Sequence, residues 1–246
     1  MRPQVFFSKS KVFKVCLTPK SVQALKRECK NSQSIGKEWL SGSECPLYYW
    51  GGGVAFSERF FVKPKTEEGV EWALGLLSGA LDSPQNRSQT LECLIREYSF
   101  LLGEIEAGEY VLSVMPRRIL LREFPVQPVH GDVKINNMVK GSGGIRLIDW
   151  EYFSLQYFLF YDIADFCSHV ERLYRKGQVG VGFFDKSRLL YQKSLDFYYL
   201  SEKEARALTL VTQILLGSNR TRLRGQKRKR YEKRLQDLQN LAPDIR

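Results

Sequence analysis

The segment VQPVHGDVKINNMVKGSGGIRLIDWEYFSLQYFLFYDIADF, residues 126–166, contains two short apolar runs that each lead into an acidic side chain. The first run, residues 126–129, is followed by the tripeptide His-Gly-Asp, which ends at Asp132. The second run, residues 145–148, comes after a glycine-rich turn and is followed by Asp149. Short apolar runs bounded by turn residues predict β-strands. We therefore expect two loops, each with a carboxylate, to leave neighbouring strands close together.

Asn137 lies five residues after Asp132, so the segment offers two carboxylates and one amide. Phosphoryl transfer requires a protein mainly to position the reactants and to neutralise charge. Asp132 could accept the proton of an attacking hydroxyl group, while Asn137 and Asp149 supply oxygen ligands of the kind that Mg²⁺ prefers. Asp and Asn also cap turns, and any one of these residues alone would be assigned that role. The three together predict a phosphotransfer site.

The order of these residues resembles the catalytic and metal-binding loops of the aminoglycoside phosphotransferase and choline kinase group. Beyond His130-Gly131-Asp132 and Asn137, the sequences IDWEY at residues 148–152 and YDIA at residues 161–164 are most similar to the choline, ethanolamine and thiamine kinase branch. The resemblance implies an α+β, protein-kinase-like, two-lobed fold with a reduced β-rich N-lobe and a mainly helical C-lobe.

The same resemblance implies ATP and Mg²⁺ as cofactors and gives each polar residue of the segment a role. Asp132 would position or deprotonate the acceptor hydroxyl, and His130 would brace the catalytic loop through hydrogen bonds without being the base itself. Asn137 and Asp149 would bind the metal ion.

Lys14 and Glu28 are the candidate phosphate-binding pair. Residues 12–17 are strand-like, and Pro19 separates them from an amphipathic run at residues 21–31, which is typical of a helix. In kinase-like proteins a strand lysine holds the α and β phosphates, and a glutamate from the next helix orients it. The resemblance implies these roles for Lys14 and Glu28. A solvated lysine beside an exposed helix glutamate is the alternative, because several other lysines lie nearby in the sequence.

The segment before Lys14 departs from the family pattern. Thirteen residues precede Lys14, whereas two strands joined by a glycine-rich loop over the phosphates would need about twenty. Residues 8–11, SKSK, contain no glycine. We expect this lid to be shortened, absent or built differently, and a truncated start of the sequence would give the same pattern.

The predicted boundary between lobes follows two further strands. Residues 46–50 and 54–63 read as strands around a turn of three glycines. The turn at residues 63–65 is then the expected hinge, and the adenine is expected to bind backbone groups near Val62 and Lys63.

These expectations divide the chain into a nucleotide-side lobe, residues 1–65, and a helical lobe, residues 66–246, that holds the catalytic and metal-binding loops. In the second lobe, apolar periodicity predicts helices that begin at residue 67, at residue 91 and between residues 189 and 216, followed by a basic C-terminal helix. The helix expected over residues 91–105 should end near Gly108, and the glycine-containing residues 172–182 should form a loop.

The composition is that of a globular protein of a reducing compartment. Of its 246 residues 43% are hydrophobic and 13% aromatic, which suffices for a buried core. No apolar run approaches the roughly 18 residues that span a bilayer, and the N-terminus lacks the apolar stretch of a secretory signal. The five cysteines are widely spaced, with no Cys-x-x-Cys pair that would indicate a zinc site. We expect a cytoplasmic protein with reduced thiols.

Positive charge is concentrated at the C-terminal end. The net charge is +11, and residues 217–246 hold ten Lys or Arg against three Asp or Glu. A basic helix of this kind is commonly a solvated face. Peripheral contact with an anionic membrane or a lipid-linked substrate is the next alternative, because basic clusters near such a leaflet gain roughly 1 kcal/mol per charge. Nucleic acid ranks third, since no recognition motif accompanies the charge.

We predict an ATP- and Mg²⁺-dependent kinase that phosphorylates a hydroxyl group of a small molecule or saccharide. The family suggests choline, ethanolamine, thiamine or an aminoglycoside as the acceptor. One alternative is a kinase of a membrane-bound glycan or lipid such as a lipopolysaccharide core, which the basic tail favours. Another is a catalytically silent nucleotide-binding module with a polyanion-binding tail, which the missing lid favours. The sequence identifies neither the acceptor nor the oligomeric state.

Overall fold

The computed structural model describes residues 4–7, 11–16, 19–34, 48–52, 54–58, 63–83, 87–141, 144–218 and 226–245. The chain divides into two compact units. The first comprises Met1–Ser83, His130–Ser154 and Phe166–Arg188, and the second comprises Pro84–Val129, Leu155–Asp165 and Leu189–Arg246. The predicted division into lobes at residue 65 stays a prediction.

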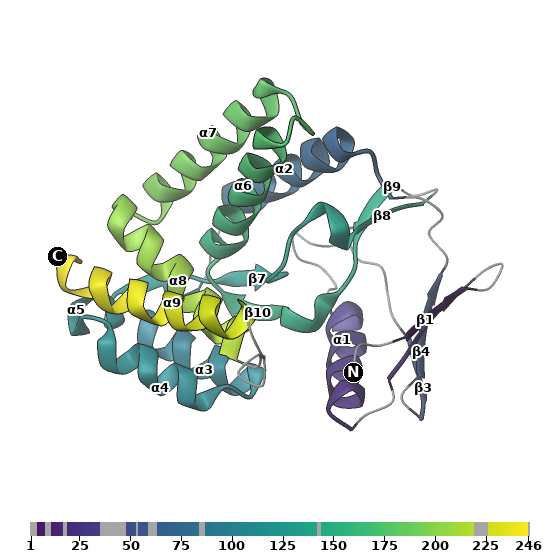
Figure 1. Ribbon diagram of the computed structural model, residues 1–246, viewed down its shortest axis with the longest axis horizontal. Helices are drawn as coiled ribbons and strands as arrows, with labels where there is room; N and C mark the ends of the chain where they lie inside the picture. The colour runs from purple at the N-terminus through teal and green to yellow at the C-terminus, as the bar shows by residue number, and fades with distance from the viewer. Residues whose placement is uncertain are drawn as a thin grey trace. The chain divides into compact units, whose positions relative to one another are not determined.

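A four-stranded antiparallel sheet belongs to the first unit (Figure 1). Its strands are β1 (Gln4–Phe7), β2 (Lys11–Val15), β3 (Tyr48–Gly51) and β4 (Val54–Glu58), in the spatial order β1-β2-β4-β3. On β2, Lys14 lies opposite Val5 of β1 and Ala55 of β4. The lysine is therefore on an inner strand of the sheet.

Helix α1 (Pro19–Ser34) packs on this sheet through a small apolar cluster. Leu25 and Cys29 are four residues apart, so they share a helix face, and both are buried together with Cys16 and Ala55. Pro19 is the first helical residue, where the missing N–H of proline costs no helical hydrogen bond. The cluster fixes α1 beside the strand that carries Lys14.

A β-hairpin in the first unit carries the two predicted loops. Strands β8 (Met138–Gly141) and β9 (Gly144–Leu147) pair antiparallel, with Met138 opposite Leu147. The 3₁₀ turn η1 (Ile135–Asn137) immediately precedes β8, and the 3₁₀ turn η2 (Trp150–Tyr152) follows β9. The register therefore brings η1 and η2 to the same end of the hairpin.

Three helices complete the first unit. Helix α2 (Thr66–Asp82) lies wholly within it, whereas α6 (Phe160–Arg175) and α7 (Val181–Phe197) each contribute one end. The connection between α6 and α7 is tied to α2, because the Gly180 backbone N–H donates to Glu67 Oε1 at 3.2 Å. Lys186 Nζ pairs with Glu71 at 2.9 Å one helical turn further along α2.

The second unit is mainly helical. It contains the short strands β5 (Ser88–Thr90), β6 (Glu123–Pro125), β7 (Gln127–Val129) and β10 (Ser154–Tyr157), and the helices α3 (Leu91–Leu102), α4 (Ile105–Val114), α5 (Arg117–Leu120), α8 (Glu202–Ser218) and α9 (Gln226–Leu241), followed by the 3₁₀ turn η3 (Ala242–Asp244). Aromatic residues fill its core: the Tyr98 and Tyr157 rings stack with centroids 4.2 Å apart, and the Tyr157 hydroxyl lies 2.9 Å from Thr212 Oγ1.

Two predicted helix boundaries were wrong. The helix expected over residues 91–105 ends at Leu102, because Gly103 adopts a left-handed conformation with φ 73° and stops it; a separate helix begins at Ile105. The loop expected over residues 172–182 is limited to the five residues between α6 and α7.

Among the described residues, no helix has the combination of length and apolar character that crossing a bilayer requires.

Candidate active site

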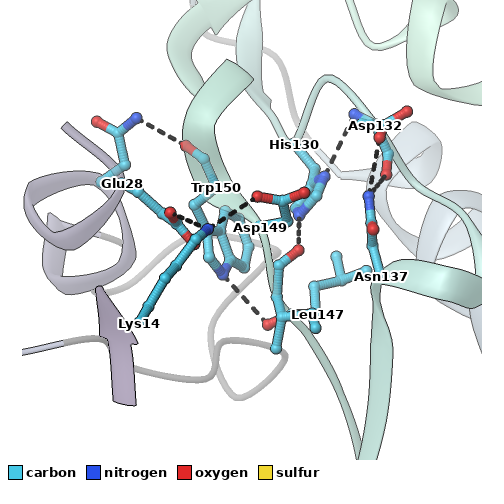
Figure 2. Close-up of polar contacts among 10 residues, drawn as sticks. Lys14, Glu28, His130, Asp132, Asn137, Leu147, Asp149 and Trp150 are labelled. Carbon is cyan, nitrogen blue, oxygen red and sulfur yellow. Dashed lines mark hydrogen bonds and ion pairs between the residues drawn. The ribbon is translucent and has the colours of Figure 1, made fainter. Parts of the chain in front are cut away.

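The described candidates at the predicted site lie in the first unit (Figure 2). Lys14 comes from β2 and Glu28 from α1, and the other four, His130, Asp132, Asn137 and Asp149, flank the β8–β9 hairpin. Their polar groups form two connected clusters: Lys14, Glu28 and Asp149 form one, and His130, Asp132 and Asn137 form the other.

Lys14 joins the sheet, α1 and the second loop. Its Nζ donates to Glu28 Oε2 at 2.5 Å and lies 3.4 Å from Asp149 Oδ1. Glu28 is only 6% exposed, and a buried carboxylate is stable in its charged form only when a cation is paired with it. The pair is therefore no chance surface contact, and the ammonium group is held where the second loop begins.

The backbone of η2 is held against α1 and β9. The Asn31 side chain on α1 donates to the carbonyl oxygen of Trp150 at 2.9 Å, and the Trp150 indole N–H donates to the carbonyl oxygen of Leu147 at 3.2 Å. Asp149 itself has φ 69° and ψ 56°, a left-handed conformation that Asp and Asn tolerate better than most residues. This turn points the carboxylate of Asp149 toward Lys14 (Figure 2).

His130 connects the two loops from a fully buried position. Its Nε2 lies 3.0 Å from the carbonyl oxygen of Ile148, and the backbone N–H of Asp132 donates to its Nδ1 at 3.3 Å. Burial lowers the pKa of His130 to about 4, although the nearby carboxylate of Asp132 acts in the opposite direction. The ring is therefore neutral near pH 7, with its Nε2–H donating and its Nδ1 accepting. Both ring nitrogens are thus engaged with the two loops, and the bracing role of His130 stays a prediction.

Trp150 covers the buried face of His130. The two rings make an edge-on contact with centroids 4.4 Å apart, and Trp150 is 1% exposed. Gly131, between His130 and Asp132, has φ 82°, and a Cβ atom there would lie 2.7 Å from both the Cβ and the carbonyl oxygen of Tyr152. The first loop therefore approaches η2 at a distance that only glycine permits.

Asp132 and Asn137 are bonded to each other. Asn137 Nδ2 donates to Asp132 Oδ2 and to the Asp132 carbonyl oxygen, both at 2.9 Å. The backbone N–H of Ile148 in turn donates to the Asn137 carbonyl oxygen at 2.9 Å. With the amide nitrogen engaged, the amide oxygen is the atom of Asn137 that suits a metal ion.

Lys134 is a site residue that the sequence interpretation missed. Its Nζ donates to Asp132 Oδ1, and its side chain is 32% exposed. The spacing Asp-x-Lys was the available signal, because alternate residues of an extended segment lie on the same side of the chain.

The donor set fits a magnesium ion. Asp149 has a carboxylate that is 38% exposed, and Asn137 adds an amide oxygen; both are hard oxygen ligands. Within the described residues no group of three His, Cys, Asp or Glu side chains forms a metal site. This agrees with the habit of Mg²⁺ to take one or two protein ligands and to complete its shell with phosphate oxygens and water.

The predicted adenine-binding residues are only partly described. Lys63 is exposed on the extended segment before α2, and Val62 lies outside the described residues. Both assignments stay predictions.

The buried thiol of Cys29, next to Glu28, is not reactive, because burial and the neighbouring carboxylate raise the pKa of Cys29 to about 12.

No protein-family model matches the chain, and no curated protein sequence matches it. Solved structures do match. The ADP-bound aminoglycoside phosphotransferase APH(2'')-Ib aligns with 99% of this chain and 90% of its own, at 14% identity and a TM-score of 0.54. The gentamicin complex of APH(2'')-IIa covers 96% and 87%, at 15% identity and a TM-score of 0.56. The choline kinase LicA from Streptococcus pneumoniae covers 97% and 90%, at 14% identity and a TM-score of 0.51.

The chain has the two-lobed, protein-kinase-like fold. This confirms the predicted α+β class and the resemblance to aminoglycoside phosphotransferases and choline kinases, while identities this low establish the fold alone. In protein kinases of this fold the phosphate lysine lies on the third strand, after a hairpin that covers the phosphates. Here the candidate for that role, Lys14, lies on β2, and among the described residues β1 is the strand that precedes it. The segment between β1 and β2, where a covering loop would be, lies outside the described residues.

Proposed function

We propose that the protein is an ATP- and Mg²⁺-dependent phosphotransferase that phosphorylates a hydroxyl group of a small molecule or saccharide. The observation that carries the proposal is the joining of Lys14, Glu28 and Asp149 from three separate elements, next to the Asp132–Asn137 pair. If these residues only capped turns, a buried ion pair between β2 and α1 would not be expected among them. The solved structures with this fold include enzymes that bind ADP, gentamicin or AMP, which supports a nucleotide-dependent transfer.

In this mechanism Asp132 orients the acceptor hydroxyl group and takes up its proton as the oxygen attacks the terminal phosphate. Asn137 keeps Asp132 in place through one hydrogen bond to its carboxylate and one to its backbone carbonyl oxygen. Lys134, bonded to Asp132, places a positive charge beside the attacking oxygen, where negative charge on the transferred phosphoryl group has to be balanced.

Lys14 binds the non-transferred phosphates, and Glu28 restricts it to one orientation. His130 couples the two loops, so that Asp132 and Asp149 keep a fixed relation to each other through Ile148. Asn137 and Asp149 would hold Mg²⁺, which, when bound, supplies positive charge to the phosphate oxygens. Positioning and charge neutralisation of this kind account for most of the catalysis in phosphoryl transfer.

An acceptor screen tests the proposal. We would measure ADP release from ATP and Mg²⁺ with amino alcohols, thiamine, aminoglycosides and core sugars as acceptors, in parallel for the natural protein and for Asp132→Asn. We expect acceptor-dependent ADP release that falls by at least a hundredfold in the variant, because the substitution keeps the shape of Asp132 and removes its proton-accepting charge. Equal turnover in both proteins would contradict the role of Asp132.

A membrane-bound glycan or lipid is a second candidate acceptor, and exposed basic residues on α9 favour it. Arg228, Lys229, Arg230 and Lys233 are all exposed, and of these Arg228 is paired with Glu232 at 2.7 Å. Helix α9 packs on α8 and buries Leu238, so its basic residues are left on the outward side. A positively charged face of this kind suits an anionic leaflet.

The silent nucleotide-binding alternative is less well supported. A module that only binds nucleotide has no chemical need for Asp132, whereas here Asn137 and Lys134 are both bonded to its carboxylate. The screen above separates the two cases, because a silent module would bind ATP without acceptor-dependent ADP release.

A further inference from the structure

Basic side chains gather close to Asp132 within the first unit. Helix α6 carries His169 and Arg172, whose spacing of three residues places them on one helix face, and Lys176 follows in the turn directly after the helix. The charges of Asp132 and Lys134 both act on the His169 ring. His169 on this face of α6 therefore lies within electrostatic range of Asp132 and Lys134 in the catalytic loop.

The positive charge of this face is not neutralised by neighbouring carboxylates. Arg172 and Lys176 are exposed, and in the part of the chain that the structure describes neither forms a salt bridge. Other cations of the same unit are paired: Arg175 bonds Glu171 at 2.5 Å, and Lys186 bonds Glu71 at 2.9 Å. Next to the reacting group there is thus an excess of positive charge.

His169 lies within this basic group and has an unused polar atom. Its Nε2 is shielded from solvent and, among the described residues, has no hydrogen-bond partner. Burial and then the charge of Arg172 lower the pKa of His169 to about 4, so the ring is neutral near pH 7. Buried polar atoms without a partner are rare in folded proteins, and a rotation of the ring that brings Nε2 to the surface would let an oxygen atom of a bound ligand supply the missing partner.

The aromatic residues that would suit a cationic acceptor have no exposed ring faces. Tyr157, Phe158 and Phe160 are each at most 1% exposed, and Tyr161 is 4% exposed. They fill the core and do not form a cage for a quaternary ammonium group, which needs an accessible ring face. The excess of positive charge and the burial of these aromatic rings therefore both disfavour a cationic acceptor.

We propose that the acceptor carries an anionic group, a phosphate or a carboxylate, near its reacting hydroxyl, and that Lys134, His169 and Arg172 bind this group. The proposal rests on the phosphotransferase function proposed above and specifies its substrate class. Arg forms forked, charge-assisted bonds with both kinds of anion, and an exposed Arg172 can reach a ligand without moving the backbone. A cationic acceptor would be repelled by the same side chains.

The test uses four sugars that share one ring and differ in charge. They are glucose, glucose 1-phosphate, glucuronate and glucosamine, each offered with ATP and Mg²⁺ while ADP release is measured. We expect one of the anionic sugars to have a kcat/KM at least tenfold above that of glucose, and glucosamine to be the poorest. A comparison of glucose 1-phosphate with glucuronate identifies whether the site prefers a phosphate or a carboxylate.

Two matched variants on one helix assign the effect to the site. Arg172→Ala should raise the KM for the preferred anionic sugar at least tenfold, with kcat changed less than threefold. Arg175→Ala removes the same charge three positions away, from an arginine that is paired with Glu171, and should leave both constants unchanged. Equal effects of the two variants would overturn the assignment.

Binding is measured in parallel, by thermal denaturation of the full chain with a non-hydrolysable ATP analogue and each sugar. If no sugar is phosphorylated, stabilisation by an anionic sugar that Arg172→Ala abolishes would support the anion site while the kinase function fails. Stabilisation that is equal in both proteins, or absent, would overturn the anion site. If glucosamine or choline were the preferred acceptor and its turnover depended on Asp132, the anion site would be overturned while the kinase function would stand.

Discussion

His130 is the residue through which the two loops of the site depend on each other. One ring nitrogen contacts the residue before Asp149, and the other accepts the backbone N–H of Asp132. The bond that Nδ1 accepts requires the neutral ring, and burial favours that form. Protonation of His130 would place a donor against the backbone N–H of Asp132 and a charge in the core, so it opposes the folded state.

This geometry predicts an acid-sensitive fold. An unfolded histidine binds a proton below about pH 6.5, whereas folded His130 does so only near pH 4, so the unfolded state holds more protons between these values and stability falls as the pH falls. At about 1.4 kcal/mol per pKa unit, His130 accounts for a loss of roughly 3 kcal/mol. His169, with its pKa also lowered to about 4, is the second of two histidines in the chain.

Denaturant unfolding of the natural protein and of His130→Gln between pH 6.5 and pH 5 measures the first part of this loss. The variant should be less stable at pH 7 but should lose clearly less stability per pH unit, because only His169 continues to titrate in that window. Parallel pH dependences in the two proteins would show that His130 is not the group responsible.

Single residues of the site could be predicted where their chemistry is tied to a fixed spacing. Asp132, Asn137 and Asp149 stood out because their order along the chain is unusual, and Lys14 because a strand precedes a helix with a glutamate. Lys134 and His169 could not be found this way. Lys134 follows Asp132 by two residues, a spacing too common to single it out, and the position of His169 depends on the packing of α6, which leaves no pattern in the sequence.

At the scale of elements, the geometry of the site depends on the close approach of the first loop, at Gly131, to η2. Gly131→Ala should lower the free energy of unfolding by about 2 kcal/mol or more and reduce turnover, because its φ of 82° is strained for alanine and the new Cβ would meet Tyr152 at 2.7 Å. Gly75→Ala is the control. Gly75 lies in α2 with nothing within 4 Å of an added Cβ, so the same change should raise stability by up to about 1 kcal/mol.

Chemical denaturation of both variants gives the comparison directly. Similar stabilities for Gly131→Ala and the natural protein would mean that the loop and η2 have room to move apart, and the bracing of the site would lose its basis.

Periodicity predicted which elements exist better than where they end. The strand with Lys14, the helix with Glu28 and the basic C-terminal helix were all expected from apolar spacing. The break between α3 and α4 was not, because apolar residues continue past it and only the left-handed conformation of Gly103 stops the helix. Likewise α7 begins at Val181, eight residues before the expected helix, since Gly177, Gly180 and Gly182 made the preceding residues read as a loop.

At the scale of the whole molecule, the basic face of α9 predicts salt-sensitive attraction to anionic membranes. Lys229→Glu combined with Lys233→Glu should abolish cosedimentation with phosphatidylserine vesicles at low salt, since each charge near the surface contributes about 1 kcal/mol. These two residues are exposed, so the change spares the packing of Leu238 that a deletion would destroy. Arg118→Glu combined with Arg206→Glu, also exposed, should retain binding. Vesicle binding that is lost equally in both variants would point to net charge rather than to α9.

The central claim is that Asp149, Asn137 and Lys14 together hold a magnesium nucleotide. Calorimetric titration of the full chain with a non-hydrolysable ATP analogue, with and without Mg²⁺, tests it most directly. Asn at position 149 tolerates the left-handed backbone and removes only the charge. We predict that binding requires Mg²⁺, that Asp149→Asn weakens it at least tenfold, and that Asp132→Asn changes it less than threefold. Equal affinity in Asp149→Asn and the natural protein, or binding indifferent to Mg²⁺, would contradict the account.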